Sequence, residues 1–460
     1  GSLIVPKLPD PAETLRVVEA RDFGGDLLLK DVQERVVAVL HMAEALSCKY
    51  HVVVANPPYM GAKGMNGKLQ NFAKANYPNS KSDLFAMFTE RSFYFSLNQG
   101  LLGLLTMQSW MFLASYSKLR ISILDQNRLV QLFHTGPGLF PELGAFNVLT
   151  AAFIMSRGVN EDLQQCTFVK ANQTPDIQDK VNRLRDPESH IRLDLSSLAG
   201  VPDRPIVYWL TRSALESFSN RDLIQDSSPP KGGLTTGDNV KFVRSWEEVS
   251  FDNIGFDISN VADASASQSR WFPYNKGGKY RKWYGNNEFI IDWRNNGEVL
   301  RNDPKSVIRN SQYFFKRGIV YSIFGFENFG VRYKPDGFVF DVSGASIFPK
   351  DLEVVLAYLC SNVSFYFLRA LAPTVNFQVG DIARLPLPSL SGSSRQRVQL
   401  LARACIEIAK RDWDSNENSW DFRVQPLLSL SKGTLVETFS SYLEHRNQER
   451  DELRSNEEEI

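Results

Sequence analysis

A short apolar strand that ends in two consecutive prolines constrains the fold of this chain more than any other feature. The run Val52-Val53-Val54-Ala55 is β-branched and apolar, as expected of a strand buried in a parallel sheet. It stops abruptly at Asn56-Pro57-Pro58-Tyr59. Proline has a fixed φ and no backbone N–H, so the pair predicts a rigid extended turn at the carboxyl edge of the sheet, where open α/β folds place their binding sites.

This turn carries groups that suit an exocyclic amine. The side-chain oxygen of Asn56 and the carbonyl of Pro57 can each accept a hydrogen bond from an NH2 group, and the ring of Tyr59 offers a face on which an extruded base can stack. Stacking uses the ring and not the hydroxyl, so Tyr59→Phe is expected to be nearly silent. The alternative is a hairpin turn that happens to contain two prolines.

Length and charge bound the remaining possibilities. At 460 residues, the chain is long enough for two or three domains of about 150 residues each. Its 52 basic and 52 acidic residues give a formal net charge of zero. Any surface for nucleic acid must therefore come from local segregation of charge.

Cysteine usage and hydropathy point to a cytoplasmic protein. Cys48, Cys166, Cys360 and Cys405 lie far apart without a CxxC pair, so we expect buried thiols, no disulfide framework and no metal site. No apolar stretch approaches the roughly 20 residues needed to cross a bilayer, and no membrane partner is expected. The opening Gly1-Ser2 has the form of an expression remnant and not of a signal peptide.

The order of elements around the turn predicts a partial α/β sheet. Hydrophobic periodicity and turn residues indicate a helix at 31–46 before the turn, then a glycine-rich loop at 61–79 and a helix at 83–97 that is capped by Ser82. A strand at 101–107, a helix at 114–126 and two further strands at 129–133 and 147–155 follow. This order is that of the second half of a doubly wound sheet that closes with an antiparallel hairpin. We expect a partial Rossmann-like domain over residues 1–158.

Four segments resemble the gamma class of amino-group DNA methyltransferases. Asn-Pro-Pro-Tyr resembles their catalytic motif in the form that acts on N6 of adenine, and the segments 80–88 and 103–110 resemble the helix and strand that follow it. The segment 138–151 is similar to the hairpin whose aromatic residue faces the tyrosine across the flipped adenine. The resemblance implies catalytic roles for Asn56, Pro57, Pro58 and Tyr59, and base stacking by Tyr59 and Phe140, with Phe146 as the alternative to Phe140.

A longer resemblance is more specific. The segments 56–67, 234–239, 271–278 and 282–287 resemble the large adenine methyltransferases of BREX phage-defence systems, the phage growth limitation type, from about residue 22 to residue 387. This implies a site-specific DNA adenine N6-methyltransferase that uses S-adenosyl-L-methionine. Its expected partner is double-stranded DNA, with other subunits of the defence system as further candidates.

The gamma class also has a glycine-rich cofactor loop before its catalytic motif, and this chain lacks one. No Phe-x-Gly-x-Gly or Asp-Pro-x-x-Gly-x-Gly pattern occurs before Tyr50. The candidates for contact with the cofactor are Asp22, with Asp26 as its alternative, together with Asn56 and Asp83. We therefore expect the carboxyl-terminal portion of a longer enzyme that does not catalyse methyl transfer by itself.

The second half predicts a mixed α+β target recognition domain and a helical end. After a polar link at 158–205, β-rich segments fill 242–348 and a long helix follows at 351–371, so we place the recognition domain at 159–390. Residues 391–460 are expected to be helical, with an acidic tail from Glu449 that is either a frayed helix or disordered. A methyltransferase needs such a second surface because sequence is read in the DNA grooves.

The stretch 270–284 interleaves cations with aromatic residues. This pattern suits phosphate contacts beside stacking or groove contacts, and the candidate DNA-binding residues are Arg270, Lys276, Lys279, Arg281 and Lys282. A solvated loop with buried aromatic residues is the alternative.

Three functions therefore remain open. The leading one is a site-specific adenine methyltransferase. The runner-up is a DNA-recognition module without turnover. Within the enzyme class, a type IIG restriction-modification enzyme is also possible, although no PD-x-(D/E)-x-K nuclease pattern occurs here.

Overall fold

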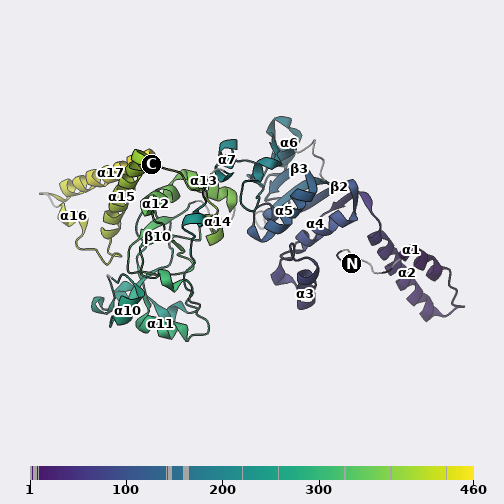
Figure 1. Ribbon diagram of the computed structural model, residues 1–460, viewed down its shortest axis with the longest axis horizontal. Helices are drawn as coiled ribbons and strands as arrows, with labels where there is room; N and C mark the ends of the chain where they lie inside the picture. The colour runs from purple at the N-terminus through teal and green to yellow at the C-terminus, as the bar shows by residue number, and fades with distance from the viewer. Residues whose placement is uncertain are drawn as a thin grey trace. The chain divides into compact units, whose positions relative to one another are not determined.

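The computed structural model describes residues 3, 8, 10–140, 142, 148–158, 165–219, 221–256, 258–325, 328–372, 376–430 and 433–460. The chain divides into two compact units, Gly1–Glu216 and Ser217–Ile460, and both combine helices with β-sheet (Figure 1). The predicted mixed α/β class is confirmed. The division falls after Glu216, whereas the sequence placed the first boundary after residue 158.

The first unit is built on one sheet. Its strands are β1 (Tyr50–Ala55), β2 (Ser96–Met107), β3 (Asn127–Gly136), β4 (Thr150–Arg157), β5 (Gln165–Lys170) and β6 (His190–Asp194). Its α-helices are α1 (Pro11–Glu19), α2 (Leu27–Ser47), α3 (Gly67–Asn76), α4 (Leu84–Phe95), α5 (Ser117–Gln126), α6 (Ile177–Arg185) and α7 (Arg212–Ser219), the last of which crosses the division between the units.

The strand order in this sheet is β1-β2-β4-β3-β5-β6. β1 is parallel to β2, with Ala55 opposite Leu104, and β3 is parallel to β5. β4 lies between β2 and β3 and is antiparallel to both, which is the predicted antiparallel closure. The helices α4 and α5 pack on the sheet through a shared core that includes Phe85, Leu119 and Ile123 (Figure 1).

β1 is not the buried strand that its sequence predicts. Among the described residues it pairs only with β2, and the side chains of Val52 and Val54 are 57% and 78% exposed. Val53 and Ala55 on the other face are partly buried, and Ala55 packs against the core of the unit, so this edge strand is covered on one face and leaves the apolar side chains of the other in solvent. The prediction of a strand was right and the prediction of its burial was wrong.

Local capping explains where the helices around the turn begin. Asp26 accepts hydrogen bonds from the amides of Leu28 and Leu29 at the start of α2. Asp83, and not the predicted Ser82, caps α4 by accepting from the amide of Phe85 at 3.2 Å. A carboxylate at this position satisfies an otherwise unpaired amide and is favoured by the helix dipole.

The segment predicted as a polar link belongs to the first unit. β5, α6 and β6 lie in the described part of 158–205, and both strands extend the sheet beyond β3. The buried guanidinium of Arg120 donates to the carbonyls of Asp203 and Arg204, and the amide of Ile206 donates to Met111. Polar composition misled the prediction, because β5 is a short strand that nevertheless buries Cys166, Phe168 and Val169.

The second unit contains the predicted β module. Its strands are β7 (Val243–Ser245), β8 (Trp271–Asn275), β9 (Phe289–Asp292), β10 (Gly318–Tyr321), β11 (Val331–Lys334), β12 (Val339–Phe340) and β13 (Ser346–Ile347). Its helices are α8 (Ile224–Ser227), α9 (Asn239–Phe242), α10 (Val261–Ala266), α11 (Arg294–Arg301), α12 (Leu352–Cys360), α13 (Asn362–Leu371), α14 (Val379–Ala383), α15 (Gly392–Asp414), α16 (Pro426–Ser429) and α17 (Leu435–Glu459).

The strands of this unit form two small sheets, in the orders β12-β8-β9-β7 and β11-β10-β13. The long helix predicted at 351–371 is two helices, α12 and α13, bent by 70° at Ser361, whose hydroxyl accepts from the amide of Ser364 and starts the second helix. No single helix among the described residues is long and apolar enough to cross a membrane. The bent pair α12 and α13 is long and apolar enough when its two helices are taken together, but this rests on length and composition alone.

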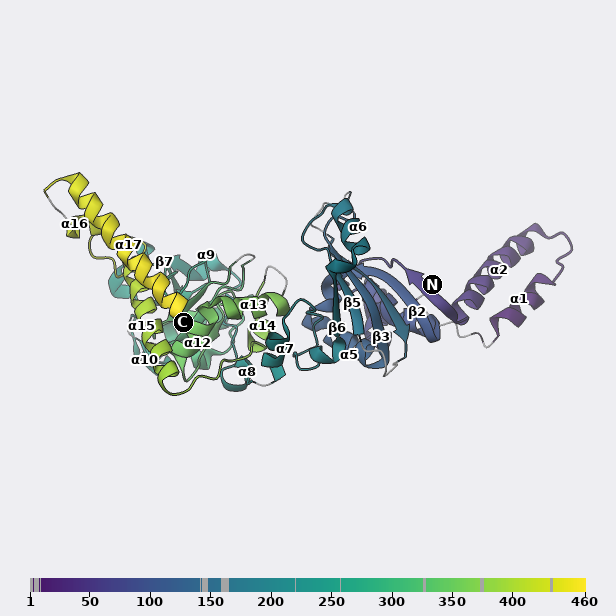
Figure 2. The same ribbon diagram turned by 90° about the horizontal axis from the view of Figure 1, so that it is seen from above.

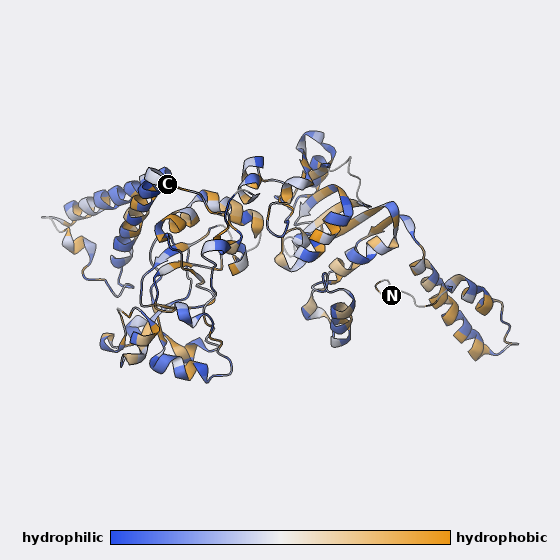
Figure 3. Ribbon diagram, in the orientation of Figure 1, coloured by the Kyte–Doolittle hydropathy of each residue, from blue (hydrophilic) through white to orange (hydrophobic). Residues whose placement is uncertain are grey.

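The end of the chain is ordered as helix. Residues 449–459, predicted to fray or to be disordered, form the last turns of α17, which Figure 3 shows as mostly hydrophilic. They are held by contacts to distant residues, such as the ion pair between Arg397 and Glu459. Of the cysteines, Cys166, Cys360 and Cys405 are buried as predicted, whereas Cys48 is exposed at the end of α2.

Candidate active site

The Asn-Pro-Pro-Tyr turn leaves the sheet at the carboxyl end of β1, as predicted. Asn56 and Pro58 are exposed, Pro57 is buried, and Tyr59 is half-buried against the core of the first unit. The hydroxyl of Tyr59 reaches back to the neighbouring strand and donates to the carbonyl of Leu105 at 3.3 Å. The turn is therefore fixed to the sheet edge by its aromatic residue while its amide faces solvent.

The same hydroxyl lies 2.9 Å from Oδ1 of Asn56. Burial raises the pKa of Tyr59 to about 12, so the hydroxyl stays protonated at neutral pH and shares its single proton between this oxygen, the nearer acceptor, and the carbonyl of Leu105. An amide oxygen has two lone pairs, and one remains for an incoming amine. From the sequence, Tyr59 was predicted only as a stacking surface, and this hydrogen bond was not expected.

Two rings meet the ring of Tyr59 edge to face. Phe85 lies at a centroid distance of 6.3 Å and Phe140 at 6.4 Å, with interplanar angles of 87° and 79°. The predicted neighbourhood of Tyr59 and Phe140 is thus present, but the rings are nearly perpendicular, so a base stacked on the exposed face of Tyr59 requires Phe140 to turn. Phe146, the alternative stacking residue, lies outside the described residues.

Asp83 joins the turn to α4. Its Oδ1 accepts from the amide of Met60 at 2.9 Å as well as from Phe85, and burial raises the pKa of the carboxyl although these amides oppose the shift. The amide of Leu84 in turn donates to the carbonyl of Met60. Asp83 was predicted as a cofactor contact. One of its carboxylate oxygens, Oδ1, is instead used to fix the residue that follows the catalytic turn to the start of α4.

The loop that carries Phe140 is clamped by a buried lysine. Lys180 on α6 is 1% exposed, and its ammonium donates to the carbonyls of Thr135 and Ala171 at 2.6 and 2.7 Å and also to that of Thr174. All three N–H groups are thus used on backbone oxygens at the ends of β3 and β5, near which Figure 2 shows α6. This ammonium ties the segment that leads to Phe140 to the loop before α6.

Glycines allow the two loops to approach so closely. Gly138 has φ +92°, and a Cβ there would lie 2.3 Å from the carbonyl oxygen of Pro175. Any other residue would push the loops apart. Sequence reasoning missed Lys180, because nothing in the local pattern of α6 distinguishes it from an exposed lysine.

A second buried polar group lies below the same loop. His134 on β3 is 1% exposed and bonds Tyr208 through Nδ1 at 3.0 Å and Gln108 through Nε2 at 2.8 Å. Burial, assisted by Lys170 and Lys180, lowers the pKa of His134 to about 3, so the ring is neutral at physiological pH. The network joins the ends of β2 and β3 to the segment 206–209.

Asp22 is not brought to this site by any described contact. It lies in the turn between α1 and α2, where its carboxylate accepts from the amide of Gly24 at 3.0 Å. Asp26 caps α2. Among the described residues, no group of three or more His, Cys, Asp or Glu side chains could hold a metal ion.

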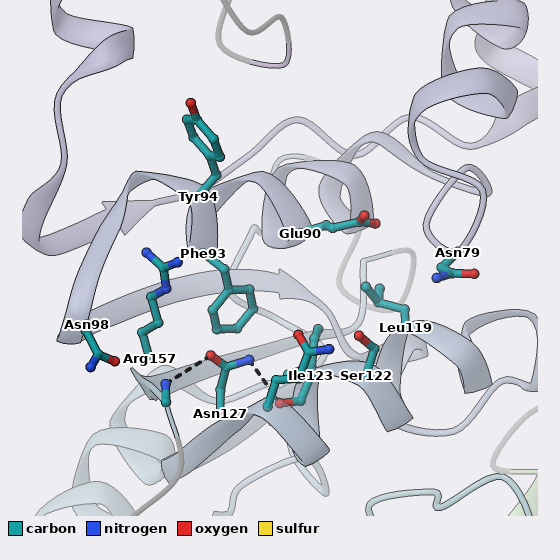
Figure 4. Close-up of a pocket in the computed structure, with 12 residues that line it drawn as sticks. Asn79, Glu90, Phe93, Tyr94, Asn98, Leu119, Ser122, Ile123, Asn127 and Arg157 are labelled. Carbon is teal, nitrogen blue, oxygen red and sulfur yellow. Dashed lines mark hydrogen bonds between the residues drawn. The ribbon is translucent and has the colours of Figure 1, made fainter.

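A polar depression of about 330 Å³ opens at the other end of the strands, away from the Asn-Pro-Pro-Tyr turn (Figure 4). Asn98 and Asn127 line it near the amino ends of β2 and β3, with Arg157 at the end of β4 and Glu90 on α4. Asn127 is already committed to the amide of Gly158 and the carbonyl of Ile123. Since the Asn-Pro-Pro-Tyr turn follows the carboxyl end of a strand parallel to β2, this depression is not part of the candidate site.

The cations predicted to contact DNA lie in the second unit, and three of the five are paired there. Arg270 forms an ion pair at 2.8 Å with Asp292, which is 4% exposed. Arg281 pairs with Asp412 on α15, and Lys282 pairs with Glu457 on α17 at 3.2 Å. Burial opposes the charged form of Lys282, but Glu457 raises its pKa above the usual value.

The other two cations are differently placed. Lys276 lies 5.7 Å from the ring centroid of Phe289, and Lys279 is exposed. Trp283 is 2% exposed and donates from Nε1 to Glu457 at 2.7 Å. Much of the basic aromatic stretch therefore packs against the helical end of the chain. This arrangement is closer to the alternative prediction, a solvated loop with buried aromatic residues, than to a surface of free cations.

Comparison with known proteins supports the predicted resemblance. Residues 28–140 match the family of Eco57I restriction-modification methylases. The chain is 33% identical over 425 residues to the adenine-specific methyltransferase BrxX of Escherichia coli O9:H4 (strain HS), and 34% identical over 453 residues to the adenine-specific methyltransferase PglX of Lacticaseibacillus casei (strain Zhang). These alignments cover 91% and 92% of the chain, and the resemblance to the BREX methyltransferases is confirmed.

The same alignments cover only 34% and 36% of the relatives, so the chain spans about a third of the length of the curated proteins it matches. Among solved structures, the Type IIL restriction-modification enzyme MmeI in complex with DNA is similar at a TM-score of 0.48 and 11% identity, over 89% of this chain and 58% of that one. A nuclease-deletion mutant of the Type ISP enzyme LlaGI is similar at 0.47 and 13%, over 86% and 38%.

Proposed function

We propose that this chain carries the methyl-acceptor site and the DNA-recognition part of a site-specific adenine N6-methyltransferase of the BREX type. The observation that carries the proposal is the Asn-Pro-Pro-Tyr turn at the carboxyl end of β1, in which Tyr59 orients Asn56 and meets Phe140. The similarity to two adenine-specific methyltransferases over nine tenths of the chain supports it. Double-stranded DNA is the proposed substrate.

In this proposal the turn positions the adenine amine. Oδ1 of Asn56 and the carbonyl of Pro57 accept the two amine hydrogens, which aims the nitrogen lone pair away from the turn. The hydrogen bond from Tyr59 keeps the Asn56 amide from rotating. The rings of Tyr59 and Phe140 hold the base and exclude water, so the reaction gains its rate from orientation more than from a strong base.

S-adenosyl-L-methionine is the proposed methyl donor, which would supply an electrophilic methyl group. The described residues supply no complete cradle for it, because Asp22 sits in the turn between α1 and α2 and Asp83 has only its Oδ2 left, since Oδ1 accepts from two backbone amides. That misfit favours a second candidate function, a DNA-recognition module without turnover.

The substitution Asn56→Ala separates the two candidates. In the natural gene product that carries this chain, transfer of a tritiated methyl group from S-adenosylmethionine to duplex DNA should fall at least about a hundredfold, since loss of an orienting acceptor costs on the order of 3 kcal/mol. DNA affinity should be unchanged. The control is Asn302→Ala, an exposed asparagine in the second unit.

Two results would argue against the acceptor site. Methylation that persists in Asn56→Ala above about a hundredth of the parent rate would remove Asn56 from the reaction. If the parent itself binds duplex DNA and transfers no methyl group, the recognition module becomes the better description.

A further inference from the structure

The segment between the catalytic turn and α4 is strongly cationic. Residues 60–82 contain Lys63, Lys68, Lys74 and Lys81 and no Asp or Glu. All four lysines are exposed. Within the described part of the chain, none of their ammonium groups forms an ion pair, and the nearest acids in sequence are Asp83 and Glu90, whose carboxylates accept from a backbone amide and from Ser80.

This distinguishes the segment from the stretch first predicted to bind DNA. There, Arg270, Arg281 and Lys282 are neutralised by carboxylates of their own unit. A cation already paired must exchange its partner to bind a phosphate, whereas a free ammonium group only releases water. In a chain with no net charge, a run of four unpaired cations is the kind of local segregation that a polyanion requires.

The segment is also a built element and not a loose loop. It contains a 3₁₀ turn at Ala62–Gly64 followed by α3, and Asn66 caps α3 by accepting from Leu69 at 2.9 Å. The side chain of Gln70 donates to the carbonyls of Ala62 and Met65, both at 3.0 Å. The lysines therefore project from a fixed frame, which reduces the entropy lost when they bind.

A small core fastens this frame to α4. Met65, Ala73 and Tyr77 pack with Leu84 and Met87, separately from the main core of the unit. Figure 1 shows α3 standing off the sheet beside α4.

Both ends of the element meet at the candidate site. Gly61 pairs with Asp83 in an isolated antiparallel bridge, and the amide of Ala62 donates to the carbonyl of Ser82 at 3.0 Å. The element thus starts directly after Tyr59 and returns to the residue that caps α4. Its position relative to Asn56 is set by the two backbone hydrogen bonds of this bridge, from Leu84 to the carbonyl of Met60 and from Ala62 to the carbonyl of Ser82.

We propose that residues 60–82 form a phosphate-binding element that grips the DNA backbone beside the adenine held by the catalytic turn. The inference rests on the proposed function for its substrate, and it assigns the binding surface to residues that the sequence analysis did not select. The partner is duplex DNA, because a base that leaves the stack exposes flanking phosphates next to the pocket that receives it. The lysines make no base contacts, so the element adds affinity and not sequence selectivity.

The test compares two quadruple variants with the same loss of charge. One replaces Lys63, Lys68, Lys74 and Lys81 by Ala. The control replaces four exposed lysines elsewhere, namely Lys30, Lys118, Lys305 and Lys350. Binding of a specific and a scrambled duplex is measured at several salt concentrations. For the first variant, the slope of log affinity against log salt should shrink by up to about 0.9 for each phosphate that a lysine no longer neutralises, equally on both duplexes, while the control keeps its slope.

Acetylation of lysines supplies a readout that does not depend on variants that may misfold. Duplex DNA should protect the four lysines of 60–82 and leave those of the control set reactive. Equal reactivity with and without duplex, an unchanged salt slope, or no binding of duplex by the chain would overturn the inference. Equal protection by poly-glutamate of matched charge would also overturn it, in favour of an acidic protein partner.

If the lysines of 60–82 do not contact DNA, the proposed function is not affected, because it has a separate test. The acceptor site is judged by methyl transfer in Asn56→Ala, which does not involve the lysines. Conversely, duplex protection of the four lysines in a protein that transfers no methyl group would support the phosphate-binding element and reject turnover.

Discussion

The phenolic oxygen of Tyr59 lies 2.9 Å from Oδ1 of Asn56 and 3.3 Å from the carbonyl oxygen of Leu105. One hydroxyl therefore links the amide that is proposed to receive the adenine amine to the strand next to β1. It also means that the ring and the hydroxyl of Tyr59 have different tasks, which substitution can separate.

Tyr59→Phe should lower kcat by roughly fivefold to tenfold and leave DNA affinity unchanged. A neutral hydrogen bond contributes about 1 kcal/mol, and its loss frees the Asn56 side chain to rotate. The sequence alone predicted a silent substitution. Single-turnover methyl transfer decides the question, and Tyr59→Leu, which removes ring and hydroxyl together, should be slower than Tyr59→Phe. Equal rates for parent and Tyr59→Phe would restore the view that only the ring matters.

Lys180→Met should loosen the Phe140 loop. The variant leaves buried carbonyls without a donor, so the free energy of unfolding of the first unit should fall by about 1 to 3 kcal/mol. Arg185→Met on the exposed side of the same helix is the control.

A readout at the target base tests whether the clamp positions Phe140. In a duplex with 2-aminopurine at the target adenine, the base should be less quenched with Lys180→Met than with the parent, because stacking by Phe140 weakens. Lower stability with unchanged quenching would make Lys180 a structural residue only.

His134 should make stability depend on pH. Its folded pKa of about 3 lies below the value of 6.5 in the unfolded chain, so protons bind preferentially to the unfolded state between these limits. The contribution is complete above pH 6.5 and is lost as pH falls toward 3, at up to about 1.4 kcal/mol per pH unit.

His134→Gln removes the titration while keeping groups that can bond Gln108 and Tyr208. Denaturant unfolding at pH 7 and pH 5 should therefore show a larger loss of stability for the parent than for this variant. Parallel losses would mean that the imidazole is accessible to protons in the folded state.

Replacing Lys279, Arg281 and Lys282 together by Ala should disturb the end of the chain more than DNA binding. Arg281 and Lys282 hold α15 and α17 through Asp412 and Glu457. Such half-buried pairs contribute modestly, at most about 1 kcal/mol each, but α17 buries few side chains of its own. Limited proteolysis should cut α17 faster, and Glu457→Gln should reproduce part of this effect.

The salt dependence of DNA binding identifies which view of this stretch is right. We expect the slope of log affinity against log salt to change by no more than about 0.9, the contribution of Lys279 alone. If the slope decreases by about three times that amount, all three cations contact DNA phosphates and the stretch belongs to the DNA-binding surface.

The sequence by itself determined the local features of this protein. The strand before Asn56, the turn imposed by Pro57 and Pro58, and the helices on either side follow from φ restriction, capping and hydrophobic periodicity, which act within a few residues. The resemblance of these segments to adenine methyltransferases needed nothing more. Phe140, chosen by its place in the order of motifs as the residue that stacks on the base, lies edge to face with Tyr59, and its stacking role stays a prediction.

Only the tertiary structure decided which distant groups meet. Lys180 and Thr135 are separated by 45 residues, and Lys282 and Glu457 by 175. A buried lysine that donates to three backbone carbonyls and a lysine in solvent have the same sequence signature, since burial depends on distant segments of the chain that pack around the residue. For the same reason, β5 and β6 were predicted as a link, and paired cations at 270–284 were chosen before the unpaired ones at 60–82.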